Sequence, residues 1–257
     1  MLSEIDVDIT NKLQIIRGYI SRKRSFFEAP EWLEISKEGS QTDMMTRLLD
    51  IAIKVPGLLE DTDNALGSGD EALAMKVMTD VVDALQRFHH WLTRWHDAIG
   101  EESYHLQDIE EFPAFVETCD DRTFPKAFKF RSFQNGYLHC KYWLCRCFLQ
   151  KAIMDLLARY PNLPCAWTPK EIDQDLLGDA INICQAIPYF CQPAASSTGR
   201  FSTFVPLRFV TLFFEARKMR AQQRWGEKVA ATIYSQGIAP PSLRQGYFLW
   251  RPYLYGK

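Results

Sequence analysis

The sequence predicts an all-α fold, with many helices arranged around one central apolar helix. Apolar residues recur at steps of three and four along most of the chain, whereas the alternation typical of strands is scarce. Hydrophobic residues make up 47% of the 257 residues and charged residues 24%, so a sizeable core can be buried. We expect about seven to nine helices in a single domain over residues 1–257.

The N-terminal part contains the clearest helix signals. A first apolar face has steps of 4, 3 and 4: Ile9, Leu13, Ile16 and Ile20. Ser40 and Asp43 form a variant capping box before the apolar stretch 44–49, and Pro56-Gly57 then punctuates the chain. The longest apolar stripe covers about five turns: Val77, Val81, Leu85, Phe88, Leu92 and Trp95.

The central helix is expected over residues 128–160. Residues 110–125 before it are predicted to form a connecting loop, because two prolines there break helices. Apolar side chains then cover nearly the whole circumference of the helix, so it should be the most buried element. Its length allows a break at Asn135-Gly136. Trp143 lies near its middle, and we expect a partner for its indole N–H.

The C-terminal part begins at a strong helix start. Residues 168–171, T-P-K-E, place Thr at the N-cap, Pro at the first helical position and Glu at the third. The helix that follows should stop near Pro188, and residues 192–202 are predicted to form a polar loop. Two further helices are expected over residues 204–221 and 225–236.

Charge and composition argue against several classes of protein. The net charge is −2 and the pI about 6.2, so the positive excess with which proteins grip nucleic acid is missing. No apolar run approaches the ~18 residues that span a bilayer, and the start has no apolar signal region. We expect no strong direct nucleic-acid binding, no membrane contact, and a location in the nucleus or the cytoplasm.

The cysteines indicate neither a disulfide framework nor a zinc site. There are seven, and no pair has C-x2-C spacing: Cys119, Cys140, Cys145, Cys147, Cys165, Cys184 and Cys191. We expect reduced, mostly buried thiols that behave as small hydrophobic side chains. The sequence therefore assigns no metal ligand and no cofactor.

An ordered series of short segments resembles a known family. The series is F-F-E-A-P-E-W at 26–32, L-L-D-I at 48–51, P-G-L-L at 56–59, Y-W at 142–143, I-P-Y at 187–189 and R-W at 224–225. From about residue 10 to residue 246, the order and spacing resemble the fungal-specific regulatory domain attached to zinc binuclear cluster transcription factors. The chain departs from that family at the DNA-reading module, because it lacks six cysteines in paired spacing.

The resemblance implies a helical regulatory domain that acts through a small-molecule effector or a protein partner, with homo- or hetero-dimerisation open. It also implies a setting such as a fungal secondary-metabolite gene cluster. The leading hypothesis is therefore a transcription-regulator-like protein without its own zinc cluster. The alternative is a repurposed pathway enzyme or cyclase that uses an apolar helical cavity.

No catalytic residue is assigned. Residues 88–96, F-H-H-W-L-T-R-W-H, contain neither H-E-x-x-H nor histidines four apart, so the three histidines are interpreted as solvated or hydrogen-bonded. Trp91 and Trp95 are four apart and are interpreted as a packing pair. The adjacent carboxylates at 110–111 and 120–121 do not indicate acid–base catalysis, because neighbours rarely converge on one substrate.

Three further segments have competing interpretations. The triplet Arg22-Lys23-Arg24 fits a nuclear-import signal or, preferably, a solvated helix face, and a second basic cluster lies within 217–224. Residues 196–200, S-S-T-G-R, match no nucleotide-binding or nucleophile motif and are interpreted as an inter-helix loop. The aromatic tail at 247–255 is expected to pack on the domain or on a partner.

Overall fold

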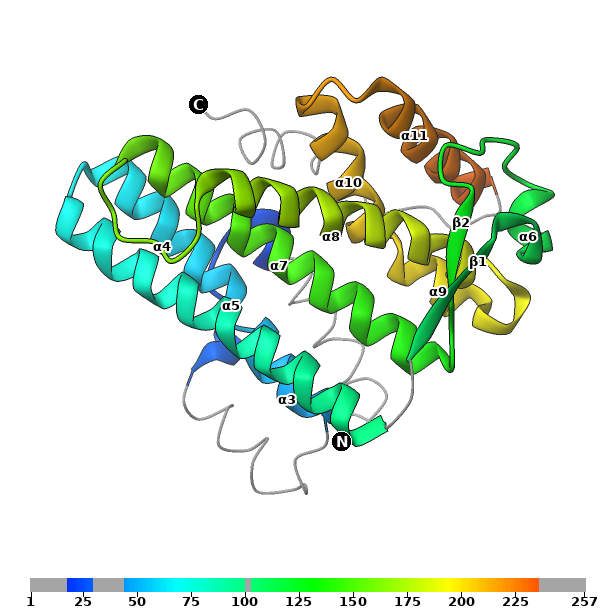
Figure 1. Ribbon diagram of the computed structural model, residues 1–257, viewed down its shortest axis with the longest axis horizontal. Coiled ribbons are helices and arrows are strands. Elements are labelled where there is room, and N and C mark those ends of the chain that lie inside the picture. The colour runs from blue at the N-terminus through cyan, green and yellow to red at the C-terminus, as the bar shows by residue number, and fades with distance from the viewer. Residues whose placement is uncertain (1–17, 30–43, 100–102, 236–257) are drawn as a thin grey trace. The chain divides into compact units, whose positions relative to one another are not determined.

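The computed structural model describes residues 18–29, 44–99 and 103–235 (Figure 1). Within these residues the protein is predominantly α-helical: nine α-helices, α3 to α11, accompany one two-stranded sheet. This confirms the predicted all-α class. The helix count agrees with the expected range, although several predicted boundaries change.

The chain divides into two compact units. Unit 1 is formed from residues 1–98 and 145–177, and unit 2 from residues 99–144 and 178–257. Two long helices each contribute to both units, so neither unit is one continuous stretch of sequence.

Unit 1 is built from helices. They are α3 (Met44–Ala52), α4 (Val55–Ser68), α5 (Glu71–Ile99), the C-terminal half of α7 (Phe133–Arg159) and the N-terminal half of α8 (Pro169–Phe190), preceded by the short 3₁₀ helix η1 (Phe26–Glu28). The stripe predicted for α5 is confirmed, because five of its six residues are buried and Leu92 is half-buried. Residues 18–21 are helical. The rest of the first predicted helix and the capping box at 40–43 lie outside the described residues.

Pro56-Gly57 lies at the start of the second of two consecutive helices, α3 and α4. Helix α3 ends at Ala52, and Pro56 lies in the first turn of α4, where the missing N–H costs no helical hydrogen bond. Helix α4 in turn ends at Gly69, whose φ of +71° is the left-handed conformation that glycine adopts without strain.

Unit 2 combines a small sheet with helices. Its elements are β1 (Tyr104–Asp108), η2 (Ile109–Glu111), α6 (Pro113–Val116), β2 (Lys126–Phe130), the remaining halves of α7 and α8, η3 (Pro193–Ala195), α9 (Ser196–Ser202), α10 (Phe204–Ala216) and α11 (Arg220–Ser235). Strands β1 and β2 pair antiparallel, with Tyr104 opposite Phe130 and Asp108 opposite Lys126 (Figure 1). The predicted connecting loop at 110–125 is thus the mostly irregular connection of this hairpin.

The predicted start of the central helix near residue 128 is wrong. Phe128 and Phe130 lie in β2, and α7 begins at Phe133. The five residues of β2 bury Ala127 and both phenylalanines and expose the lysines, a pattern too short to distinguish a strand from a helix. The partner strand β1 lies well upstream in the sequence, so the pairing that decides the conformation is not visible locally.

Helix α7 is buried on all sides along its middle, as predicted. Residues 142–145 and 147–150 are consecutively buried, and successive helical residues point about 100° apart. Trp143 is 4% exposed and contacts the rings of Tyr104, Phe128 and His139. The predicted partner of its indole N–H is not seen among the described residues. Aromatic packing instead surrounds this side chain.

The helix runs through Asn135-Gly136 without a break. A Cβ on Gly136 would lie 3.0 Å from the ring of Phe130 and 3.2 Å from that of Phe190. The glycine therefore serves close packing of two aromatic rings against the helix rather than a kink.

The capping box at the start of α8 is confirmed. The Glu171 N–H donates to Thr168 Oγ1 at 3.3 Å, and the Thr168 N–H donates to Glu171 Oε2 at 2.8 Å. The helix continues two residues beyond Pro188 to Phe190, so the predicted stop is slightly early.

The polar loop predicted at 192–202 is wrong, because η3 and α9 occupy most of it. The sequence there contains three serines, one threonine, one glycine and one proline, residues of low helix propensity. A Cβ on Gly199 would lie 2.5 Å from both the Phe190 carbonyl oxygen and the Ala195 Cβ. The backbone of this short helix packs closely against neighbouring residues. Helix propensity, which depends on the local sequence alone, does not detect such contacts.

Candidate functional site

All three basic residues at 22–24 are tied directly to α4. Arg22 makes a two-point contact with Asp63, with Nε 2.8 Å and Nη2 2.9 Å from the two carboxylate oxygens. Lys23 Nζ lies 2.9 Å from Glu60 Oε1. The Arg22 side chain is only 10% exposed, so its guanidinium is held in a partly desolvated place.

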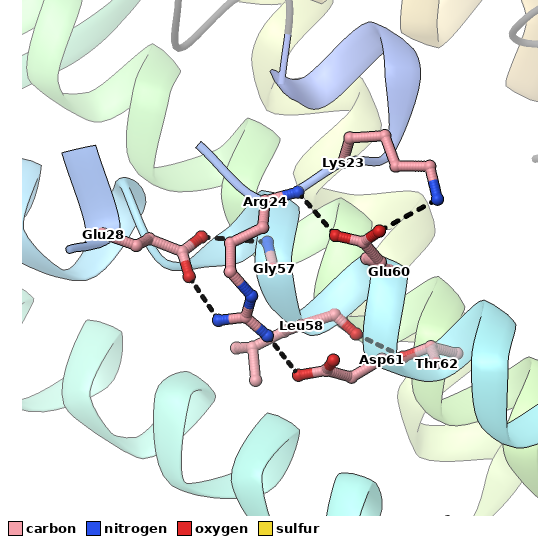
Figure 2. A network of polar contacts seen from close by, with 8 residues as sticks. All are labelled: Lys23, Arg24, Glu28, Gly57, Leu58, Glu60, Asp61 and Thr62. Atoms are coloured by element: carbon pink, nitrogen blue, oxygen red, sulfur yellow. Dashed lines mark hydrogen bonds and ion pairs between the residues drawn. The ribbon is translucent and has the colours of Figure 1, made fainter. Parts of the chain in front are cut away.

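Arg24 bridges two acidic side chains from different segments (Figure 2). Its Nη1 lies 2.6 Å from Glu28 and its Nη2 lies 2.7 Å from Asp61. We call the whole set the ion-pair clamp: Arg22, Lys23, Arg24, Glu28, Glu60, Asp61 and Asp63. The clamp fastens the segment before and within η1 to the first turns of α4.

The Glu28 side chain caps the N-terminus of α4. Its carboxylate accepts a hydrogen bond from the Gly57 N–H at 3.0 Å, as Figure 2 shows. A negative charge is favourable at a helix N-terminus, where N–H groups lack helical partners. Burial nevertheless raises the pKa of Glu28 above its usual value, and the opposing effects of Arg24 and the Gly57 N–H do not cancel it.

Glu60 has the opposite shift. It accepts the backbone N–H of Arg24 at 2.8 Å and the ammonium of Lys23. These hydrogen bonds favour the charged form and lower the pKa of Glu60. Two of the four carboxylates of the clamp, Glu28 and Glu60, therefore have pKa values shifted in opposite directions.

The solvated helix face predicted for Arg22-Lys23-Arg24 is wrong for Arg22, which is buried and paired with Asp63. Lys23 and Arg24 stay exposed, but they lie beyond the helical residues and carry carboxylate partners. Nuclear import by this triplet stays untested.

A groove within unit 1 is a candidate binding site. It has a volume of about 350 Å³, and its lining residues come from α3 and α5: Met44, Arg47, Ile51, Gln86, Arg87, His90, Trp91 and Arg94. We call it the cationic groove. The Trp91 indole donates a hydrogen bond to the Met44 carbonyl at 2.6 Å, which joins the two helices beside the groove.

Helical spacing creates this groove. On α3, Arg47 and Ile51 follow Met44 by three and seven residues, which places all three on one side of the helix. On α5, residues 87, 90–91 and 94 repeat the same spacing. Each helix therefore presents arginines next to apolar side chains.

The three groove arginines differ in their partners. Arg87 Nε lies 2.8 Å from Asp83 one turn earlier on α5. Arg47 and Arg94 have no carboxylate partner among the described residues. Asp83 is not among the lining residues, and these contain no acidic side chain. The groove thus presents positive charge that unit 1, within its described residues, does not neutralise.

Sequence analysis found part of this site. His89, His90 and His96 are exposed, in agreement with solvated histidines, and only His90 is among the residues of the groove. Trp91 and Trp95 are a stacked pair, with ring centroids 5.3 Å apart, as predicted. The three arginines were missed as a group because α3 and α5 bring them together only in space.

The other candidate segments have structural partners. Glu110 pairs with Arg122 at 2.8 Å, and Asp120 pairs with Lys228 at 3.1 Å. From the second basic cluster, Arg217 lies over the ring of Phe213, 4.4 Å from its centroid. These contacts account for Glu110, Asp120 and Arg217 without a ligand.

The cysteines agree with the prediction of unpaired, mostly buried thiols. All seven are free, and Cys165 and Cys191 alone are half-buried rather than buried. Burial raises the pKa of Cys191 to about 12, which makes a thiolate unfavourable. Within the described ranges, no group of three or more His, Cys, Asp or Glu side chains is arranged to hold a metal ion. The aromatic tail at 247–255 lies outside these ranges.

No protein-family model, curated protein or solved structure was found to match the chain. No helix in the described part of the chain is long and apolar enough to cross a membrane.

Proposed function

We propose that this chain is a transcription-regulator-like protein without its own zinc cluster, which responds to a small-molecule effector in the cationic groove. The single observation that carries the proposal is the groove itself. Its volume of about 350 Å³ falls within the roughly 300–1,000 Å³ of ordinary ligand sites. Its lining combines three apolar or aromatic residues with five polar ones, so it can hold a ligand that has both an apolar and a polar part.

The residues that line the groove favour binding of a ligand over catalysis. None of the eight lining side chains is a carboxylate, a thiol or a hydroxyl, and His90 is exposed. A nucleophile would need an adjacent base, and general acid–base catalysis would need a side chain held in place against the substrate. The groove offers neither, so the enzyme alternative has no comparable support here.

The charge pattern supports action through an effector rather than direct DNA contact. The net charge is −2, and the basic triplet at 22–24 is neutralised by the carboxylates of the clamp. Phosphate contacts supply most of the affinity in nucleic-acid binding and need available cations. A regulator of this kind would influence transcription through a partner that carries the DNA-binding module.

The proposal is tested with a groove-filling variant, Ile51→Trp, and a matched control, Ile53→Trp. Ile53 is also half-buried and lies in the turn directly after α3, outside the groove lining. A library of small organic compounds is screened by thermal melting. An effector at about 100 times its Kd adds about 2.7 kcal/mol of stability, which shifts the melting temperature by about 5 to 10 °C. We expect the shift in wild type and Ile53→Trp and its loss in Ile51→Trp.

The regulatory part of the proposal is tested by fusion of the full chain to a heterologous DNA-binding domain. A reporter gene should respond to the effector, and Ile51→Trp should abolish the response. Failure of every compound to stabilise the wild-type chain would refute the effector site. Conversion of a stabilising compound into a product, detected by mass spectrometry, would favour the enzyme alternative instead.

A further inference from the structure

We infer that the ligand of the cationic groove is an amphiphilic carboxylate, a single carboxylate group on a small apolar or aromatic body. This inference rests on the proposed function of the groove and adds the chemical class of its ligand. Arg47 on α3 and Arg94 on α5, together with the floor around Trp91, carry the argument.

The charge of the groove selects an anion. Arg47 and Arg94 both line it and have no carboxylate partner among the described residues, whereas Arg87 is already paired with Asp83. A guanidinium presents a planar set of N–H donors that matches the two oxygens of a carboxylate. A cationic ligand would meet like charges, and a neutral ligand would leave the arginine donors to water.

The floor of the groove selects an apolar body. Met44 and Ile51 supply thioether and aliphatic surface, the aliphatic stems of the arginines extend it, and Trp91, which is 3% exposed, lies beneath them. Removing this apolar surface from water under an apolar ligand body is favourable and adds to the binding free energy. A small hydrophilic anion such as inorganic phosphate would use the arginines and leave the floor exposed.

The volume limits the size of the body. About 350 Å³ lies near the lower end of ordinary ligand sites, which suits a compact molecule rather than a long acyl chain or a dinucleotide. A phenylalkanoic acid has the required parts: one carboxylate, a short linker and one aromatic ring.

Three probes that share one body test the inference. They are 4-phenylbutyrate, 4-phenylbutan-1-ol and 4-phenylbutylamine, which carry a negative, a neutral and a positive head group. Binding to the full chain is measured by titration calorimetry, with ligand-observed NMR for weak binding. We expect the carboxylate to bind at least about tenfold more tightly than the alcohol, and the amine to bind more weakly than either.

Variants identify the cations. The double substitution Arg47→Ala/Arg94→Ala should remove the preference of at least about tenfold for the carboxylate over the alcohol, and loss of the arginine stems should weaken binding of both probes, so the ratio of the two affinities is the readout. The matched control is Arg220→Ala, which removes an exposed arginine at the start of α11, outside the groove lining. It should leave the preference intact. Circular dichroism shows that each variant is folded before titration.

The possible outcomes separate the ligand class from the site. Equal binding of all three probes, abolished by Ile51→Trp, would overturn the carboxylate inference and leave the effector groove standing. The same holds if compounds of the library stabilise the chain while none of the three probes binds. Binding of an acidic peptide or of inorganic phosphate in preference to 4-phenylbutyrate would also overturn the inference. If no compound binds the groove at all, the proposed function fails with it.

Discussion

The ion-pair clamp and the cationic groove contain the same kinds of basic side chain in opposite electrostatic settings. In the clamp, Arg22, Lys23 and Arg24 are adjacent in sequence, and each has a carboxylate within 2.9 Å. In the groove, Arg47 and Arg94 are far apart in sequence and line one concave surface without a carboxylate partner among the described residues. The dense cluster of charge in the sequence is therefore the neutralised one in space.

The difference has a physical reason. Paired charges that replace water with fixed partners stabilise one arrangement of the chain, and the clamp uses them to hold residues 22–28 on α4. Unpaired charges of one sign on a concave surface raise the local concentration of an oppositely charged ligand. We expect loss of clamp charges to affect folding and loss of groove charges to affect binding.

The largest expected effect sets the scale for this comparison. Trp143→Ala removes an aromatic side chain from the packed rings of unit 2, where Trp143 stacks on Phe128 with centroids 5.4 Å apart. The cavity and the lost burial should cost about 3 to 5 kcal/mol of the free energy of unfolding. That is a large share of a typical total of about 5 to 15 kcal/mol. Urea melts give the value, and a loss below about 1 kcal/mol would mean that the core is elsewhere.

The next effect tests the clamp. Asp63→Ala removes both hydrogen bonds that this carboxylate accepts from Arg22, whose side chain is 10% exposed. Hydrogen bonds to charged groups contribute about 1.5 to 3 kcal/mol, and the half-exposed carboxylate places the expected loss near the lower value. The matched control is Asp83→Ala, which removes the exposed pair with Arg87. It should cost less than about 1 kcal/mol. Equal losses in the two variants would contradict a special role of the clamp.

A third effect concerns pH. The folded pKa of Glu60 is lowered, so its contribution to stability is present above the unfolded value of about 4.3 and is lost as the pH falls through the folded pKa. Glu60→Gln should therefore lower the free energy of unfolding near neutral pH. It should also make the free energy of unfolding depend less on pH in the acid range. Denaturant melts at pH values about one unit apart, from about pH 3 to about pH 7, measure this change in the free energy of unfolding.

Glu28 supplies the control with the opposite sign. Its folded pKa is raised, so the folded state binds the proton more tightly and stability falls as the pH rises from the unfolded value through the folded pKa. Glu28→Gln should remove this decline and keep an oxygen that can accept from the Gly57 N–H. If the free energy of unfolding of both variants changed with pH in the same way, the opposite pKa shifts of Glu60 and Glu28 would be contradicted.

The smallest effects on stability are expected for the groove arginines and for the exposed His89, which lies outside the groove lining. Arg47→Ala, Arg94→Ala and His89→Ala should each move the melting temperature by no more than about 2 °C, because none removes a buried contact of the core. Differential scanning calorimetry of the variants without ligand checks this. A loss comparable to that of Asp63→Ala would give the groove arginines a structural role and weaken the binding interpretation.

Sequence patterns predicted the elements whose evidence is local. The stripe of α5 and the T-P-K-E start of α8 were recognised because side chains three and four residues apart meet on one helix. The apolar circumference of α7 predicted its burial for the same reason. In the candidate site, the Trp91–Trp95 pair followed from spacing alone.

Other features depended on contacts between distant segments. The strand at Phe128 and Phe130 exists through pairing with β1, and the α9 segment packs Gly199 against the backbone of Phe190. Neither interaction leaves a mark in the few residues around it. The groove is of the same kind, because Arg47 and Arg94 belong to two helices and neither is unusual in its own sequence.

The sequence by itself determined that this chain is helical and buries α7, because helix periodicity and the amount of apolar surface are properties of neighbouring residues. Only the tertiary structure decided what its charges do. Coulomb interactions depend on distance and solvent access, and these are set by which helices pack together. The same arginine side chain is therefore a structural tie at Arg22, beside Asp63, and at Arg94 a cation without a carboxylate partner among the described residues.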